Sequence, residues 1–475
     1  MASEKANAKD GRAAASPRGR RLRSAVRWTV LVLAAVAAAG VLPWDGVLAL
    51  VPAASPFVAV ASALATRAVG VLSLVAAPVL LLALFKRRWF CRWACPVGVV
   101  SETLGRLRGR LQRRPNARTS TETERGGSPH PPRDNKADGQ GAAGTEPRRA
   151  SRSRGPRLAR WPAVGQWILL VTLGGACVGY PMLVWLDPLG MFTSAVGAWL
   201  RPLGLVTVLA TAPLAAVLAI SVLAPGAWCG WLCPLGGMQD LLALPARWFR
   251  RRGGDEMKRA AVKENDLTTA SPARDGGLAV GRRLFLGAGV GGAAALASEV
   301  AGRGAAPPVR PPGAVDERRF VGLCIRCGNC VRACPTGILK PDLGGGGLAA
   351  FMTPRAVFDV GYCREDCNAC GRVCPSGAIA PLPLEEKRRR TIGIAEVEVE
   401  KCVLAGGQEC AVCVSACPYQ AVEVVEPEEA FPAYPYPRVI AGLCVGCGAC
   451  EYECPTAPPR AIRVRPDAGT LGDRV

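Results

Sequence analysis

Sixteen of the chain's 21 cysteines fall in four runs near its carboxyl end, and each run closes on Cys-Pro. The first and fourth runs keep the spacing C-x2-C-x2-C-x3-C-P, which is typical of proteins that bind 4Fe-4S clusters and transfer single electrons. The predicted ligands are Cys324, Cys327, Cys330 and Cys334; Cys363, Cys367, Cys370 and Cys374; Cys402, Cys410, Cys413 and Cys417; and Cys444, Cys447, Cys450 and Cys454.

In such a run, three thiolates on one loop bind one cluster and the fourth binds a neighbouring cluster. Four runs therefore predict four 4Fe-4S clusters in two pairs. The outer two runs are regular and the inner two irregular, which favours a nested pairing of first with fourth and second with third. Sequential pairing is the alternative. Disulfides rarely repeat three cysteines at two-residue gaps, and zinc ribbons lack the Cys-Pro, so neither use fits as well.

Two shorter C-x3-C-P frames lie earlier in the chain, each after an apolar run. Their thiols could converge at a membrane surface and bind a fifth cluster, or act as a redox thiol pair. The alternative is that the two frames only end helices, with proline as the stop. Because the same frame recurs after two separate apolar runs, we favour a functional role. Cys177 stands alone in an apolar stretch and is expected to be a buried small hydrophobe. The four frame cysteines are Cys91, Cys95, Cys229 and Cys233.

The apolar runs that must position these frames are long enough to span a bilayer. We expect spans at 25–42, 68–85, 163–185 and 203–224, with an interfacial segment before the second. The predicted fold is an α-helical membrane bundle of four spans plus a fifth signal or anchor helix. An α+β ferredoxin-like polyferredoxin domain follows it, with a short β-type segment after each Cys-Pro.

The net charge of +22 lies wholly in the first 300 residues, because residues 301–475 hold 20 basic and 20 acidic side chains. Basic blocks there alternate with apolar runs, and all 11 tryptophans lie in the same part. This pattern indicates membrane topology with a cytoplasmic amino terminus and argues against a nucleic-acid partner. The single histidine, His130, leaves no bis-His haem or His-based metal site.

Arg282 and Arg283 precede Leu284-Phe285-Leu286 and a weakly apolar run, as in a twin-arginine export signal. An ordinary fifth membrane helix is the alternative, and both send the following domain outward. Residues 287–292 also read G-x-G-x-x-G, but no strand precedes them, so we expect no dinucleotide site.

The expected domains follow from these segments. They are a disordered cytoplasmic tail (1–24), a membrane domain (25–250) with a disordered cytoplasmic loop at about 105–160, a cytoplasmic linker (251–278), a signal-like segment (279–300), a linker (301–318) and the four-cluster domain (319–475).

The segments from Arg88 to Pro96 and from Trp228 to Gly236 resemble those of the NapH family of membrane proteins. The twin arginines and the sixteen cysteines resemble the MauM/NapG ferredoxin family. The chain thus resembles a fusion of the two, although residues 235–280 hold no cysteine where NapH-like proteins carry two more cluster runs.

The resemblance implies an electron carrier or quinol dehydrogenase-type subunit in the bacterial inner membrane. It would pass electrons from the membrane quinone pool, through a bound quinol, to a periplasmic redox partner such as a nitrate reductase-like system. The alternative is a NosR-like or CcoG-like polyferredoxin that serves copper-enzyme maturation or metal reduction. A scaffold whose clusters only stabilise the fold is a third hypothesis. Asp187 is a weak candidate for the proton acceptor and fits a loop turn better.

Overall fold

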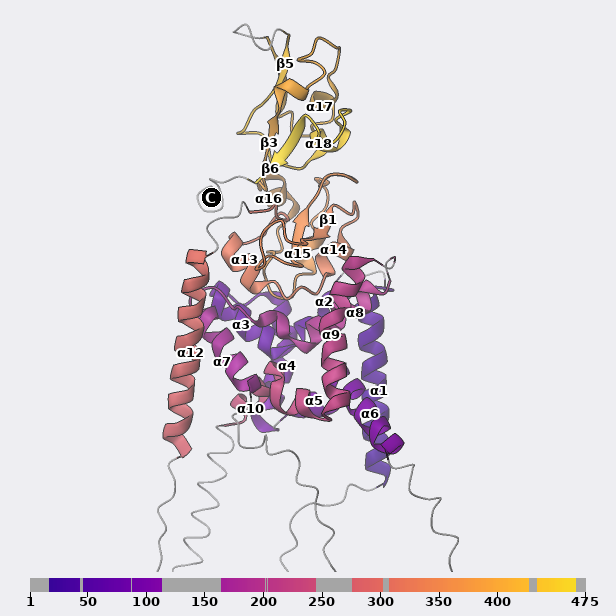
Figure 1. Cartoon of the computed structure of the whole chain (residues 1–475), viewed down its shortest axis with the longest axis vertical. Coiled ribbons are helices and arrows are strands. Elements are labelled where there is room, and N and C mark those ends of the chain that lie inside the picture. The colour runs from indigo at the N-terminus through magenta and orange to yellow at the C-terminus, as the bar shows by residue number, and fades with distance from the viewer. Residues whose placement is uncertain are drawn as a thin grey trace, which may run out of the picture.

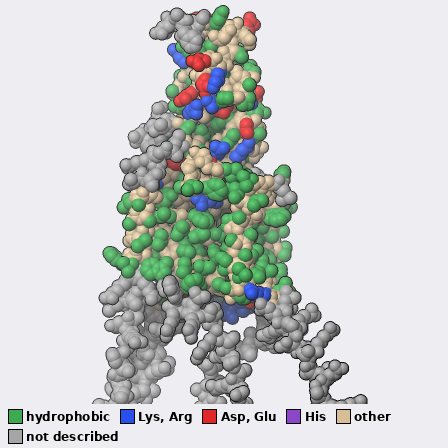
Figure 2. All heavy atoms as spheres, viewed as in Figure 1, with side chains coloured by type: hydrophobic (Ala, Val, Ile, Leu, Met, Phe, Trp, Pro, Cys, Tyr) green, Lys and Arg blue, Asp and Glu red, His purple; other side chains and the backbone are tan. Residues whose placement is uncertain are grey.

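The computed structural model describes residues 17–42, 46–86, 88–112, 164–200, 202, 204–244, 276–301, 307–426 and 434–466. An apolar helical part carries a slender upper part built from short helices and two-stranded sheets (Figure 1). Hydrophobic side chains cover the visible sides of the helical part, and charged ones gather on the upper part (Figure 2). The expected tail, the expected cytoplasmic loop and the linker at 251–278 fall mostly outside the described residues, and so does His130, whereas most of the linker at 301–318 is described.

Two of the described helices are long and apolar enough to cross a membrane, α1 (Pro17–Ala39) and α9 (Leu205–Leu223). A third crossing would exist if α2 (Val47–Ala53) and α3 (Pro56–Thr66), which meet at 91°, formed one bent span. Of these two helices, α3 occupies the segment before residue 68 that was expected to lie at the interface.

The second and third expected spans are shorter than predicted. The second is a 3₁₀ helix, η1 (Val71–Ala76), followed by α4 (Ala77–Phe85). The third, α7 (Val164–Cys177), stops early because Gly179 adopts a left-handed φ of 85° and Pro181 cannot continue a helix. The 3₁₀ helix η3 (Val184–Leu186) and α8 (Pro188–Ala198) follow it. Cys177 is exposed at the end of α7, so the prediction that it is buried is wrong.

The helix that carries the twin arginines, α12 (Gly276–Ala301), lies along α7 (Figure 1). Its glycines allow the two backbones to touch, because a Cβ at Gly291 would collide with the carbonyl oxygen of Val171 and one at Gly174 with that of Ala288. Close approach through small residues is typical of helix pairs in membranes. The G-x-G-x-x-G run therefore forms a helix-packing surface.

Each C-x3-C-P frame joins two helical segments. α5 (Trp89–Trp93) leads into α6 (Pro96–Gln112), and the π-helical turn η4 (Trp228–Leu232) leads into α10 (Pro234–Leu242). The proline of each frame thus begins a helix, where its missing N–H costs nothing, and does not act as a stop.

The upper part consists of a proximal lobe (residues 307–390) and a distal lobe (residues 391–466). In the proximal lobe β1 (Leu339–Pro341) pairs antiparallel with β2 (Pro354–Ala356). Around this sheet lie the helices α13 (Glu317–Leu323), α14 (Asn329–Ala333), α15 (Ala369–Arg372) and α16 (Leu384–Arg389).

In the distal lobe β3 (Ile394–Val397) pairs with β6 (Ile462–Arg465), and β4 (Val422–Val425) pairs with β5 (Tyr436–Val439). A 3₁₀ turn, η5 (Val399–Lys401), and the helices α17 (Val412–Ser415) and α18 (Ala449–Glu453) complete it. Three of the four expected post-Cys-Pro segments become strands. The fourth, at residues 378–380, makes only an isolated bridge from Ile379 to Ala314.

The first cysteine run docks the proximal lobe onto the helical part. Ile325 and Cys327 belong to the same buried core as Phe57 and Leu189. The Asn329 amide donates a 2.8 Å hydrogen bond to the carbonyl of Leu48 in α2. The Arg332 guanidinium donates to the carbonyl of Ala38, at the carboxyl end of α1, where the helix dipole favours a cation. A defined, partly polar interface therefore joins the two parts.

Candidate metal centres

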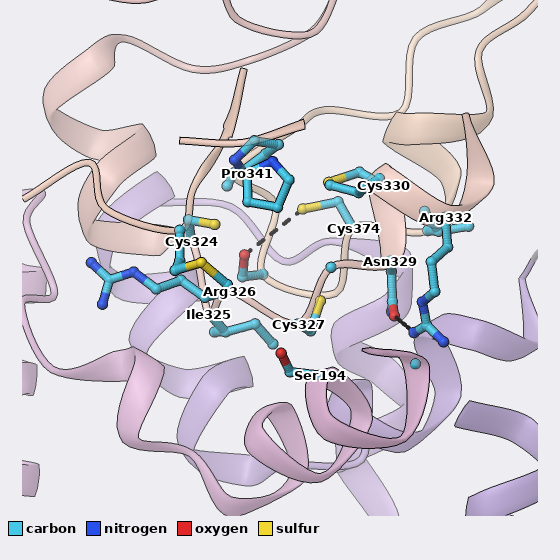
Figure 3. Close-up of a pocket in the computed structure, with 18 of the residues that line it drawn as sticks. Ser194, Cys324, Ile325, Arg326, Cys327, Asn329, Cys330, Arg332, Pro341 and Cys374 are labelled. Carbon is cyan, nitrogen blue, oxygen red and sulfur yellow. Dashed lines mark hydrogen bonds between the residues drawn. The ribbon is translucent and has the colours of Figure 1, made fainter. Parts of the chain in front are cut away.

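The structure gathers the upper cysteines into four quartets, each with three thiols from one run and one from another. Site 1 is a cavity lined by Cys324, Cys327, Cys330 and, from the second run, Cys374 (Figure 3). Site 2 is lined by Cys363, Cys367, Cys370 and, from the first run, Cys334.

The distal lobe repeats this exchange. Site 4 is lined by Cys444, Cys447, Cys450 and, from the third run, Cys417. Site 3 brings the Cys413 thiol within electrostatic range of Cys402, Cys410 and, from the fourth run, Cys454. The first cysteine run therefore pairs with the second, and the third run pairs with the fourth. The predicted nested pairing is wrong, and the sequential alternative is right.

The regular spacing of the first and fourth runs comes from the conformation of their loops and not from pairing with each other. Gly328 and Gly448 each adopt a left-handed φ, 72° and 83°, directly before α14 and α18. The inner runs enter their helices through Asn368 and Ala411 with negative φ, so their loops have a different shape. Regularity therefore reports loop conformation and carries no information on which runs pair.

The quartets suit a multi-iron cluster better than one ion. Each quartet supplies four thiols, which is the ligand set of a 4Fe-4S cluster. The thiols of sites 1, 2 and 4 surround cavities, as a cubane with one iron at each of four corners requires.

Burial makes these thiols weak acids. It raises the pKa of Cys327 and of Cys370 to about 12, and that of Cys413 and of Cys447 to about 11. Neighbouring thiols add to the shift in each case. A cluster that binds here must displace protons, so its loading releases protons and depends on pH.

Site 2 holds a buried cation that sequence reasoning missed. Lys387 in α16 is only 4% exposed, and its ammonium donates to the carbonyl of Arg364 and to the thiol of Cys363. Burial raises the pKa of Cys363, and the charge of Lys387 opposes that rise. Nothing in the run of basic residues at 387–390 distinguishes Lys387 from the three arginines after it.

Sites 2 and 4 lie next to each other across the lobe boundary. The Cys363 N–H donates a 2.9 Å hydrogen bond to the carbonyl of Cys447. Phe358 of the proximal lobe packs against Gly448, and it shares a buried core with Ala395 and Ile462 of the distal lobe. The spatial order from the helical part outward is therefore site 1, site 2, site 4, site 3.

The four frame cysteines also converge. Cys91 lies within electrostatic range of Cys95, Cys229 and Cys233, as was predicted for the two frames. The Gln239 amide donates a 3.0 Å hydrogen bond to the Cys91 thiol. The Ser101 hydroxyl lies 3.5 Å from the Cys229 thiol. We call this quartet the lower site.

A partly buried ion pair holds the two frames together. Arg88, in a left-handed conformation (φ 52°), donates to both carboxylate oxygens of Asp240 at 2.6–3.0 Å. The same guanidinium donates to the carbonyls of Cys229 and Gly230 at 3.1 and 3.2 Å. Arg88 therefore links α5, η4 and α10, a role that its place in a basic triplet did not predict.

Asp187 is a fully buried helix cap. Its carboxylate accepts from the N–H groups of Leu189 and Gly190 at 3.0 and 2.9 Å, at the start of α8. The Ser55 hydroxyl donates to it at 2.5 Å. Its predicted use as a turn residue is close to what the structure shows, although the turn is buried.

Comparison with known proteins shows that the segments holding the cysteine quartets match two families of iron–sulfur domains. The 4Fe-4S dicluster domain family matches residues 323–378, 362–421 and 408–457, and a 4Fe-4S binding domain family matches residues 67–115 and 205–252, which hold the two frames. The methylamine utilization ferredoxin-type protein MauM of Methylobacillus flagellatus is 36% identical over 178 residues, which are 35% of this chain and 72% of that protein. The chain belongs to the MauM/NapG ferredoxin family.

Other relatives of this MauM/NapG-family protein are also ferredoxin-type proteins. The ferredoxin-type protein NapG of Escherichia coli is 36% identical over 39% of this chain and 86% of its own length. The ferredoxin-type protein NapF of Escherichia coli is 28% identical over 33% and 85%. No solved structure matches the chain significantly. The chain is an iron–sulfur, ferredoxin-type electron-transfer protein with 4Fe-4S domains.

Proposed function

We propose that this protein is a membrane-anchored electron wire that takes electrons from a membrane quinol and delivers them to an extracytoplasmic redox partner. The observation that carries the proposal is the seat of site 1 on the helical part, where Asn329 and Arg332 fix the first cysteine run against α2 and α1. An electron that leaves the apolar part enters the upper part at its base and can travel toward its tip.

The sixteen upper cysteines would hold four 4Fe-4S clusters, which supply one-electron transfer when bound. The chain's own contribution is to place the quartets in the order 1, 2, 4, 3 and to set the charge around each. Lys387 supplies a cation at site 2. Arg326 and Arg310 lie within electrostatic range of Cys324 at site 1.

The helical part would act as a NapH-like membrane domain fused to a NapG-like domain, with four spans and α12 as a fifth. The lower site would hold a fifth cluster through Cys91, Cys95, Cys229 and Cys233. In this arrangement Arg282 and Arg283 direct the upper part outward to the periplasmic side of a bacterial inner membrane. Glycine packing between α12 and α7 supports retention of that helix as an anchor.

The full chain, purified with its clusters and reconstituted in lipid nanodiscs, tests this proposal. We expect a menaquinol analogue to bleach the cluster absorbance, as dithionite does. Clusters that dithionite reduces but the quinol leaves oxidised would contradict a quinol-fed wire.

A further inference from the structure

The cavity of site 1 extends past its cysteines into the helical part. Its lower wall consists of Ser194, Gly197 and Ala198 in α8 and Val206 and Ala210 in α9. Figure 3 shows Ser194 beneath the loop that carries Ile325 and Cys327. We call this extension the outer recess.

The outer recess suits a flat ring that must approach site 1 closely. Most of its wall is small or apolar, as is usual for ligand pockets, and the Ser194 hydroxyl supplies a hydrogen-bonding group. A Cβ added at Gly328, next to Cys327, would meet nothing within 4 Å, so the loop leaves open space there.

The surroundings of the outer recess point to access from lipid. α9 is one of the two described helices able to cross a membrane, and beside Val206 its side chains Leu205 and Val208 are 64% and 62% exposed. Trp199, at the end of α8, is 69% exposed, and tryptophan is common at the level of lipid headgroups. Large exposed apolar side chains here would face lipid, where an isoprenoid-tailed molecule resides.

We propose that the outer recess binds the headgroup of a membrane quinol and is the point at which electrons enter the wire. This inference rests on the proposed function and locates its substrate. It places quinol oxidation at the base of the proximal lobe, away from the lower site.

The reaction balances with the groups at hand. The quinol loses two electrons and two protons, so both O–H bonds break and two C=O bonds form. The electrons would pass one at a time to oxidised clusters held by the cysteines of sites 1 and 2, which would supply the oxidant, and the protons would pass to water. Arg326 and Arg332 are among the residues that line the same cavity, and positive charge near a bound quinol favours loss of its first proton.

Ala210→Phe tests the inference by filling the outer recess, and Val208→Phe is the matched control, since it adds the same ring to the exposed side of the same helix. Each full-length protein is reconstituted with its clusters and photolabelled with an azidoquinone, and the labelled peptides are mapped. We expect label on α8 and α9 in wild type and in V208F, and at least a tenfold loss of label and of quinol-driven reduction in A210F. Dithionite should reduce all three equally.

Label in A210F at the wild-type level, or label confined to the peptides of the lower site, would overturn the inference while leaving the proposed function intact. A wild-type protein that the quinol cannot reduce would instead remove the proposed function itself. If A210F does not retain its iron, Ser194→Ala, which removes only the hydroxyl, takes its place with the same expectations.

Discussion

At the residue scale, charge next to a thiolate decides how easily a cluster accepts an electron. A cation or a hydrogen bond at a cluster sulfur stabilises the reduced, more negative state and raises the reduction potential. Lys387 offers both at Cys363, and it is buried, so solvent screens it little. Site 2, at the boundary between the lobes, is thus a place where a single side chain can change the reduction potential of one cluster.

Lys387→Met should lower the potential of one cluster and leave the others unchanged. We expect the equilibrium constant for its reduction to fall about tenfold, which is about 59 mV for one electron. A redox titration followed by electron paramagnetic resonance measures the shift. Lys387→Arg keeps the charge and should shift far less, and Lys340→Met, at an exposed lysine paired with Asp359, should shift nothing. Unchanged potentials in K387M would contradict this role.

A ligand substitution in the fourth run tests the pairing of the runs. The structure brings Cys454 to site 3, so Cys454→Ala should impair the cluster held by the third run. Under nested pairing the same change would impair the cluster of the first run. Cysteine accessibility mapped by alkylation and mass spectrometry distinguishes the outcomes: newly reactive Cys402, Cys410 and Cys413 fit the structure, and newly reactive Cys324, Cys327 and Cys330 contradict it.

At the scale of single elements, glycine decides whether α12 can dock. Gly291→Leu would force side-chain atoms into the backbone of α7, and overpacking of this kind costs about 1–3 kcal/mol. Gly289→Leu is the matched control, because a Cβ there meets nothing within 4 Å. We expect G291L alone to lower the thermal unfolding midpoint in detergent. Equal midpoints for the two variants would mean that α12 does not depend on this contact.

The elements also show where sequence reasoning succeeds. Cysteine spacing predicts the quartets, since three thiols in one short loop can hardly avoid a common site. The β-type segments after Cys-Pro form strands wherever a partner strand is available, as β4 finds β5 and β6 finds β3. At Ile379 only Ala314 is near, and an isolated bridge results. Tertiary partners, which the local sequence does not encode, decide that difference.

Other features depend on contacts between distant segments. Arg88 meets Asp240 across 152 residues of chain, and Lys387 meets Cys363 only after α16 folds back on the second run. Hydropathy also overestimates the length of the expected third span, because residues 178–185 are apolar and hydropathy carries no information about the turn at Gly179. The sequence pattern therefore predicts the cysteines that form the sites better than it predicts the side chains that contact them.

At the scale of the whole molecule, the helical part, the proximal lobe and the distal lobe follow one another along the long axis (Figure 1). Site 1 therefore lies at the base, and sites 2, 4 and 3 follow toward the tip. The hydrogen bond from the Cys363 N–H to the Cys447 carbonyl joins the two lobes and places sites 2 and 4 next to each other. Under the proposed function, site 3 in the distal lobe is the site from which electrons would leave for the redox partner.

The order in which the clusters become reduced tests this account most directly. Reconstituted full-length protein is mixed with a menaquinol analogue and frozen at successive times, and electron paramagnetic resonance follows the signals, with K387M and C454A used to assign them to lobes. We predict that the proximal signals appear first and the distal ones after them. Distal signals that precede the proximal ones, or that appear while the proximal clusters stay oxidised, would contradict a wire fed from the membrane side.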